Sequence, residues 1–463
     1  MLSQDIAAEF EGLLLGDGRR EKRVREIARG LARQPEASLP VAMGSTAKRE
    51  GAYRCLSSRR VTLAGVLAPH IAATVERARS VGKVLLVSDT TEFRFSTERE
   101  GLGILSGKQR DGFLGHVTLA VSADGNRTPL GVLGVETIVR ANRKGRRDNV
   151  ARKKDPKRES LRWQRCAEAT SALVEGIEAI HVMDREADIY ELLAGLVKNS
   201  RRFIIRSGQE RTLEEGLLST TIQAAPMRFT REVKVSARPT AKAPASRRSH
   251  PGRKGRPANL SIATTRVTLR KPKAAFEADL PDSVTVNLVR VWETNCPAGE
   301  SPVEWRLFTT EPVDTQEHVE NVVDGYRARW LIEEYFKALK TGCDFEQSQL
   351  ESFHSLENLL GIYIPIAWQL LTLRSSARDR ADRPATEVLS PTQITALRLI
   401  YETKTLPAAP TVADVFNAIA DLGAHIKSNG LPGWQVLARG FDKLRQAEDI
   451  YRRIVSATSS DQS

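Results

Sequence analysis

One carboxylate lies among cations and a phenol in the proline-free segment 322–340. This segment is predicted to be helical after Gly325, and a helix turns about 100° per residue. Within roughly 60° of arc, one helix face carries Tyr326, Arg329, Glu333 and Lys340, with Lys337 beside them. A carboxylate flanked by phosphate-binding groups suits a metal-dependent phosphoryl-transfer site. The alternative is a solvated face with ion pairs four residues apart, such as Glu333 with Lys337.

Two further carboxylates follow predicted buried strands. Asp89 comes soon after the strand at residues 84–87, and Asp184 directly follows the strand at residues 179–183. Ligands of open α/β sheets collect at the carboxyl ends of strands, so Asp89, Asp184 and Glu333 form a candidate set. Carboxylates suit Mg²⁺ or Mn²⁺, which leave coordination positions open for water and phosphate. The alternative is that these are ordinary members of the 57 acidic residues.

The elements that must position these acids alternate between strands and helices. Strands are predicted at residues 84–87, 116–121, 129–139, 179–183 and 202–206, with helices at 161–175 and 189–197. Three strands, a helix, a strand, a helix and a strand indicate a mixed α/β sheet with an antiparallel start.

The regions around this core differ in character. Residues 1–70 are helical and basic, which fits either a DNA-binding module or an ordinary solvated helix. β-Branched residues and turn formers predict an all-β insertion at about residues 209–310, inside a central domain at 71–375. Residues 376–463 are predicted to be helical, and their apolar positions could form a dimer interface or pack within one chain.

The composition favours a polyanionic partner. The 463 residues include 70 Lys and Arg against 57 Asp and Glu, a net charge of +13. The four cysteines are far apart and form no disulfide or zinc pattern, which favours a reducing cytoplasm. There is no signal peptide and no uniform apolar run of about 18 residues, so no membrane association is expected.

Three motifs together resemble a known family. They are Asp184-Arg-Glu-Ala-Asp188, the pattern Tyr326-x2-Arg329-x3-Glu333-x6-Lys340, and Asp89-Thr-Thr91. In this order, they resemble the DDE transposases of the insertion sequence 4 family, and the resemblance extends over most of the chain.

The resemblance implies a fold, a reaction and partners. The fold is an α/β, ribonuclease-H-like catalytic core with the all-β insertion, between a helical N-terminal DNA-binding region and a helical C-terminal dimerisation region. The reaction uses two Mg²⁺ ions, for which Mn²⁺ is expected to substitute. It nicks transposon ends, forms and opens a DNA hairpin, and joins the 3′ hydroxyl to target DNA. The partners are the inverted-repeat ends, target DNA and a second copy of the chain in the synaptic complex, in a bacterial cytoplasm.

The resemblance also assigns roles to residues. Asp89, Asp184 and Glu333 are implied to be catalytic and to hold the metals. The implied DNA contacts are Tyr326, Arg329 and Lys340, with Lys337 and Arg206 as additions, and Trp305 as a platform for a flipped base. Trp305 alternates with Val303 and Leu307, so a place in the core is its alternative. Phosphate contact fits Tyr326 better than a role as covalent nucleophile does.

Two basic segments depart from the family pattern. Residues 140–158 are strongly basic here, and charge-swapping Lys153, Lys154 and Lys157 is expected to lower DNA affinity at moderate salt. Residues 254–257, Lys-Gly-Arg-Pro, resemble the core of a minor-groove hook, but general phosphate contact by Arg256 is the simpler interpretation.

Three functions fit these features. The first is an active cut-and-paste transposase working as a DNA-bridged dimer, and all three acidic positions are filled. The second is a DNA-binding remnant or repressor that keeps the fold without the activity. The third is a metal-dependent nuclease or resolvase, which leaves the β-rich insertion and the C-terminal helices unexplained.

Overall fold

The computed structural model describes residues 6–105, 111–140, 155, 158–235, 255–273, 275, 279–402, 405–426 and 431–460. Most of the basic segment at 140–158, including Lys153, Lys154 and Lys157, lies outside these residues, as does Lys254. The expectations for these segments therefore stay predictions.

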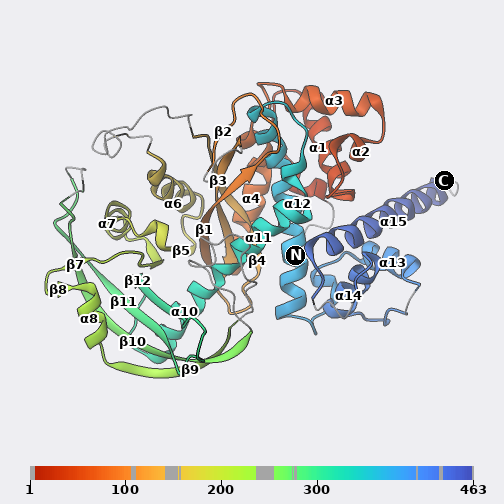
Figure 1. Ribbon diagram of the computed structural model, residues 1–463. Coiled ribbons are helices and arrows are strands. Elements are labelled where there is room, and N and C mark those ends of the chain that lie inside the picture. The colour runs from red at the N-terminus through yellow and green to blue at the C-terminus, as the bar shows by residue number, and fades with distance from the viewer. Residues whose placement is uncertain are drawn as a thin grey trace.

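The centre of the molecule is one mixed sheet of 12 strands (Figure 1). The strand order is β2-β3-β1-β5-β6-β12-β11-β10-β7-β8, with β4 paired to β3 and β9 paired to β10. The strands are β1 Lys83–Arg94, β2 Gly103–Ile104, β3 Asp111–Ser122, β4 Pro129–Ile138, β5 Glu178–Met183, β6 Arg202–Arg206, β7 Thr212–Leu213, β8 Gly216–Leu217, β9 Met227–Val235, β10 Arg256–Arg270, β11 Ser283–Thr294 and β12 Glu304–Thr309.

The predicted order of the catalytic core is confirmed. After β1, β3 and β4 come helix α6 (Arg162–Leu173), β5, helix α7 (Tyr190–Lys198) and β6. β1 pairs antiparallel with β3, whereas β1, β5 and β6 run parallel to one another. The short strand β2 adds an edge that the sequence does not reveal.

Helices cover both faces of this sheet, and the alternation of side chains along each strand explains how. On β6, Phe203 and Ile205 belong to the apolar cluster that includes residues of α6 and α7. Ile204 faces the other way and belongs to the larger cluster, together with Val323 of helix α10 (Gln316–Ala328) and Leu331 of helix α11 (Trp330–Lys337). Successive residues of a strand point to opposite faces, so one five-residue strand supports both helical layers.

The insertion expected at about residues 209–310 is not all-β. Its segment contains helix α8 (Leu218–Ala224), and β12 pairs antiparallel with β6, with Leu307 opposite Arg206. The β-rich segment therefore extends the core sheet, because the edge of β6 would otherwise expose unpaired backbone groups.

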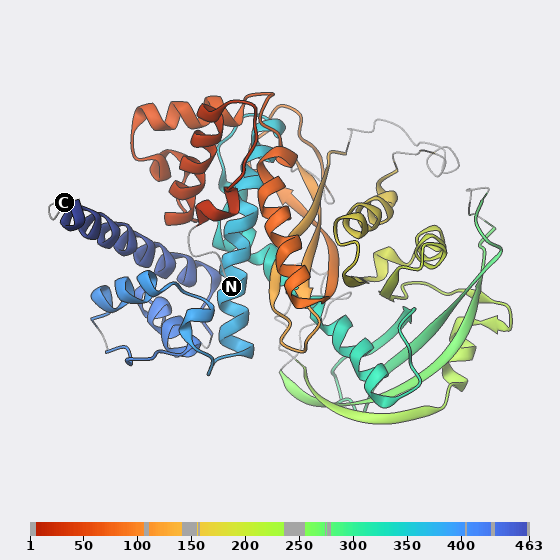
Figure 2. The ribbon, with the colours of Figure 1, turned by 180° about the vertical axis from the view of Figure 1, so that it is seen from behind.

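The N- and C-terminal helices gather around one long helix, α12 (Phe353–Asp379), which lies near the middle of the molecule in both views (Figures 1 and 2). The remaining α-helices are α1 Gly18–Arg33, α2 Leu39–Met43, α3 Thr46–Leu56, α4 Leu63–Val81, α13 Pro391–Ile400, α14 Val412–Leu422 and α15 Trp434–Ser460. Short 3₁₀ turns cover Ile6–Phe10, Glu159–Leu161, Arg185–Ala187, Phe345–Gln347 and Ala385–Glu387.

Helix α12 is the longest element that the sequence analysis misses. Among the described residues, it is the one helix that could span a membrane by length and composition, but 94% of its apolar window is buried inside the protein. A helix that is apolar on every side is typical of a protein core. Residues of the N-terminal, central and C-terminal regions all join the same apolar cluster around it, for example Leu31, Val87 and Leu437.

A buried charged cluster ties the start of the chain to the sheet. Glu9 and His70 are almost fully buried, and the Glu9 carboxylate bonds His70 Nδ1 and also Arg77 Nη1, at 2.9 Å. His70 Nε2 accepts a hydrogen bond from the Val132 N–H at 3.0 Å. His70 and Arg77 hold the pKa of Glu9 at about 2, despite the opposing effect of its burial.

We expect Glu9→Ala to lower the free energy of unfolding by about 3 kcal/mol or more, because it leaves the partly buried Arg77 without its partner. Urea unfolding near neutral pH measures this loss. The matched control is Glu76→Ala on α4, the helix that carries Arg77. Glu76 pairs with Arg79, and its side chain is 70% exposed. The control is expected to change stability by less than about 1 kcal/mol. Equal effects of the two variants would contradict this interpretation.

Candidate active site

The pairing of β1 with β5 brings two aspartates together. The parallel ladder ends where Ser88 lies opposite Met183, and the next residues are Asp89 and Asp184. Both are two residues beyond apolar positions that face α10 and α11, so their side chains start from the same face of the sheet. The sequence suggested that the strand ends just before Asp89, but Asp89 lies inside β1. β1 continues to Arg94, because β3 pairs with it along its whole length.

The run from Asp184 to Asp188 divides into functional and structural parts. The Asp184 carboxylate accepts a hydrogen bond from the Glu186 N–H at 2.8 Å, which caps the 3₁₀ turn. Asp188 is buried and bonds the Gly208 N–H at 2.8 Å and Arg211 Nε at 3.1 Å. Asp188 thus fixes the segment that follows β6. The sequence analysis gives no role to Asp188 or Arg211, and only the matching of an acid and a distant arginine in space reveals it.

The helix that carries the third carboxylate starts earlier than predicted and is interrupted. α10 begins at Gln316, capped by the Thr315 side chain, and Gly325 lies inside it. A Cβ at Gly325 would lie 2.8 Å from Ile204 Cδ1, so glycine allows the helix to approach the sheet closely. The helix breaks at Arg329 and resumes as α11. Because α10 lies close to the sheet at Gly325, Arg329, about one helical turn after Gly325, reaches Asp89.

Arg329 joins two of the three carboxylates. Its Nη1 lies 3.0 Å from Asp89 Oδ2, and its Nη2 lies 2.6 Å from Glu333 Oε1. The Asp89 and Arg329 side chains are only 17% and 14% exposed. Burial, followed by the charge of Asp184, raises the pKa of Asp89 to about 7, although Arg329 opposes this rise. Asp89 therefore lies where Arg329 only partly offsets its burial and the neighbouring acid.

The three carboxylates suit a divalent cation. The donors are hard carboxylate oxygens, which Mg²⁺ and Mn²⁺ prefer. Within the described part of the chain, however, no three acidic, histidine or cysteine groups are close enough to hold an ion as they stand. Asp89 and Glu333 each bond the Arg329 guanidinium in this arrangement. Asp89, Asp184 and Glu333 stay the predicted metal ligands.

Three of the predicted DNA contacts gather next to this site. The rings of Trp305 and Tyr326 meet edge to face with centroids 5.4 Å apart, and the Arg329 guanidinium lies 5.9 Å from the Tyr326 ring. Arg206 ends β6 and donates to the Glu304 carbonyl oxygen at 3.2 Å. Trp305 is half-buried, so it both packs on the core and keeps part of its ring accessible.

The two lysines lie farther from the carboxylates than the helix spacing predicts. Lys337 pairs with Glu334 at 3.0 Å, so the expected alternative of a Glu333–Lys337 pair does not form. Lys340 lies in a π turn over Ala338–Gly342, whose wider winding rotates it out of the predicted face. It donates to the Glu92 carbonyl oxygen, three residues beyond Asp89 on β1.

Arg256 has structural partners of its own. Its guanidinium pairs with both carboxylate oxygens of Glu293, one of them at 3.1 Å. The Glu293 side chain is 1% exposed and the Arg256 side chain 14%. A buried carboxylate needs a paired cation, so a structural role explains Arg256. Its contact with DNA stays a prediction.

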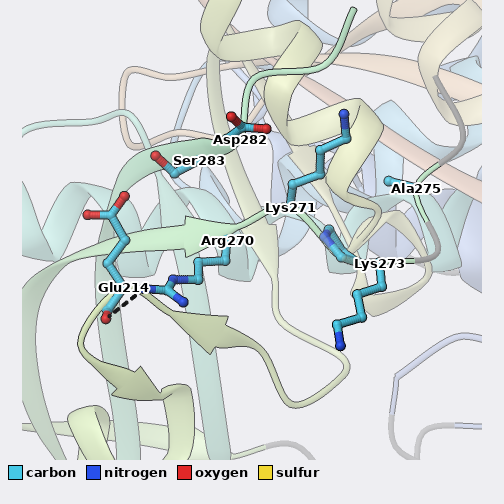
Figure 3. Close-up of a pocket in the computed structure, with 8 residues that line it drawn as sticks. Glu214, Arg270, Lys271, Lys273, Ala275, Asp282 and Ser283 are labelled. Atoms are coloured by element: carbon cyan, nitrogen blue, oxygen red, sulfur yellow. Dashed lines mark hydrogen bonds between the residues drawn. The ribbon is translucent and has the colours of Figure 1, made fainter. Parts of the chain in front are cut away.

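A surface pocket of about 560 Å³ lies elsewhere on the sheet (Figure 3). It is lined by Glu214 and by residues around Arg270 and Ser283, which pair at the end of the β10–β11 ladder. Ser283 is eight residues along β11 from Val291, the partner of Trp305, which is about 26 Å of strand. This pocket is therefore separate from the carboxylates.

Two families of known domains match parts of the chain. Residues 4–61 match a family described as Transposase DNA-binding. Residues 134–368 match a family described as Transposase DDE domain, which is just over half of the 463 residues. The second match includes Asp184 and Glu333 and begins after Asp89. The strand register is therefore the observation that adds Asp89 to the set.

We expect Asp89→Asn to stabilise the metal-free protein, and more so at about pH 8 than at about pH 5. The pKa of Asp89 rises from 3.8 to about 7 on folding, so ionising this group costs the folded state stability as the pH rises through that window. At about 1.4 kcal/mol per pKa unit, the gain should be about 2 kcal/mol larger at the higher pH.

Thermal or urea unfolding in a chelator measures this difference. Mn²⁺ at about pH 8 should restore the stability of the wild-type protein but have a much smaller effect on Asp89→Asn. A gain that does not change with pH would contradict the assignment of this strained carboxylate.

Proposed function

This chain belongs to the DDE transposases, metal-dependent enzymes that cut and join DNA, and we propose that it is an active cut-and-paste transposase. The observation that carries the proposal is the register that sets Asp89 beside Asp184, under a helix that brings Glu333 to the same end of the sheet. Within the family, the motifs favour the insertion sequence 4 group and the branch that includes the transposase of transposon 5.

The proposed metals are two Mg²⁺ ions, with Mn²⁺ as a substitute. When bound, such ions activate an attacking oxygen and stabilise the leaving oxygen of an in-line displacement. The chain's own residues supply the rest. Asp89, Asp184 and Glu333 provide the ligands, and Arg329 is released from two of them to contact a phosphate. This exchange is supported by the guanidinium that now lies between Asp89 and Glu333.

The neighbouring side chains suit a DNA end. We propose that Arg206 and Tyr326 contact phosphate oxygens, although the Tyr326 side chain is only 4% exposed, and that a displaced base stacks on the half-buried ring of Trp305. A flipped base is what a hairpin intermediate requires. We therefore propose that a freed 3′ hydroxyl attacks the opposite strand, and that water then opens the hairpin before the end joins target DNA. Lys340 and Lys337 extend the basic surface toward more distant phosphates.

The N-terminal helices are proposed to bind the transposon ends. The family match over residues 4–61 supports this, and α3 exposes several cations at its surface. The exposed cations are Lys48, Arg49, Arg54, Arg59 and Arg60. Helix α1 exposes Arg19, Lys22 and Arg29 as well, and a basic surface of this kind suits the DNA backbone.

The proposed dimer surface lies on the outer part of helix α15. The apolar C-terminal residues for which the sequence left open a dimer interface or packing within one chain, such as Phe416 and Trp434, are buried within the chain. In contrast, α15 projects from the body in both views (Figures 1 and 2), and its outer part exposes Ile450, Ile454 and Val455 by 44–59%. A projecting apolar stripe suits a second copy of the same helix in the DNA-bound complex.

We expect Glu333→Gln to lower DNA cleavage by about 1,000-fold or more while leaving end binding intact, because one carboxylate of a unit is lost. The purified protein is incubated with Mg²⁺ and the DNA that flanks its own gene, and new 3′ ends are mapped by sequencing. Glu334→Gln is the matched control, since Glu334 pairs with Lys337 and Arg374 instead.

Sharp paired ends at inverted repeats, absent with Glu333→Gln and present with Glu334→Gln, would support the transposase. Retained cleavage by Glu333→Gln would contradict the site. Protection of the repeats by the wild-type protein without cleavage would favour the DNA-binding remnant.

Ile454→Glu is expected to abolish the complex that contains two DNA ends while single-end binding persists, because a charge would enter the proposed interface. Native gel electrophoresis with labelled ends separates the two species. Leu399→Glu is the control, since Leu399 is 65% exposed but lies on α13. Loss of the paired complex in both variants would argue against a specific role for α15.

A further inference from the structure

Arg162 lies behind the candidate active site, on the opposite face of the sheet from the Asp89 carboxylate. It is the first residue of α6, and its side chain is 8% exposed. On β1, Asp89 shares a face with Val87, whereas Thr90 shares the other face with Ser88. The start of α6 reaches this second face. No motif of the sequence singles out Arg162.

The guanidinium of Arg162 connects three segments that are distant in the sequence. Its Nε donates to Thr90 Oγ1 at 2.9 Å, and its Nη2 donates to Glu186 Oε2 at 2.6 Å. Its Nη1 donates to the Glu159 carbonyl oxygen at 3.0 Å, which holds the arginine to the turn before α6. The Thr90 hydroxyl also shares a 2.9 Å hydrogen bond with His116 Nδ1 on β3.

The two side chains held by Arg162 belong to the residues that orient the aspartates. The Thr90 N–H donates to Asp89 Oδ1 at 2.8 Å. The Glu186 N–H donates to Asp184 Oδ1, also at 2.8 Å. Each aspartate therefore accepts a hydrogen bond from the backbone N–H of a residue, Thr90 or Glu186, whose side chain bonds the Arg162 guanidinium. Arg162 is thus linked to both aspartates through Thr90 and Glu186, and the Glu186 side chain is 61% exposed.

We propose that Arg162 is a positioning residue for the metal site, which keeps Asp89 and Asp184 at the separation that divalent ions require. The inference rests on the proposed function, because it assumes that these aspartates bind metal. Arginine suits the task, since its planar fork can bond a hydroxyl and a carboxylate at once. A lysine has one compact charge and can replace only one of these bonds well. Partners behind the metal ligands typically change metal affinity about 10- to 100-fold when removed.

The test compares Mn²⁺ binding to the free full-length protein, followed by the electron paramagnetic resonance signal of unbound Mn²⁺. Arg162→Met is expected to raise the dissociation constant about 10-fold or more, and Arg162→Lys to raise it less. The Mn²⁺ concentration that gives half-maximal DNA cleavage should rise in the same order. Arg202→Met is the control. Arg202 pairs with Glu311 at 2.6 Å at the start of β6, at the other end of this strand from Arg206 and the candidate site. This variant is therefore expected to lose stability without losing Mn²⁺ affinity.

Where Arg162→Met fails to fold, Thr90→Val and Glu186→Gln replace it, because each removes one of the two bonds and should weaken Mn²⁺ binding by a smaller factor. Unchanged Mn²⁺ affinity in folded Arg162→Met, or an equal loss in Arg202→Met, would overturn this inference alone. A wild-type protein that neither binds Mn²⁺ nor cleaves DNA would overturn the proposed function, and the inference with it.

Discussion

Asp89 and Asp184 lie beside each other where the parallel pairing of β1 and β5 ends, and the burial of the Asp89 carboxylate next to a second acid is the constraint on which the site depends. Folding brings the two aspartates together because the apolar residues before them set the register between β1 and β5, and this register fixes the positions of the next residues. The resulting charge is partly balanced by Arg329, which also holds Glu333. The Arg329 guanidinium therefore lies between two of the three carboxylates that we propose bind metal.

The rest of the fold supports this arrangement from both sides of the sheet. On the face of the carboxylates, Gly325 lets α10 approach the strands closely enough for Arg329 to reach Asp89. On the other face, Arg162 holds Thr90 and Glu186, whose backbone amides orient the aspartates. A rigid frame is needed because groups that repel one another would separate if the segments carrying them could move.

The flanking regions are joined to this frame by one apolar core. α12 is buried on all sides, and the helices at both ends of the chain pack around it, so the N-terminal DNA-binding region is mechanically linked to the catalytic sheet. The cluster of Glu9, His70 and Arg77 adds a second link through α4 and β4. DNA held by the first region would therefore have a defined position relative to the carboxylates.

Much of this molecule can be predicted from the sequence because its elements have strong local periodicity. The order of strands and helices in the core, the acids after β5 and on the late helix, and the family itself all follow from such patterns. The polar run after Val87 hides the second half of β1, because that half is a strand only through its pairing with β3. The same holds for β12, which extends the core sheet instead of closing a separate unit. The break at Arg329 and the π turn that displaces Lys340 also escape a regular helical wheel. The sequence by itself determined which residues are candidates for the chemistry and on which kind of element they lie, since side-chain type and spacing are local properties. Only the tertiary structure decided which acid pairs with Arg329, which arginine lies behind the aspartates, and which apolar helix is central, since those choices depend on contacts between residues far apart in the chain.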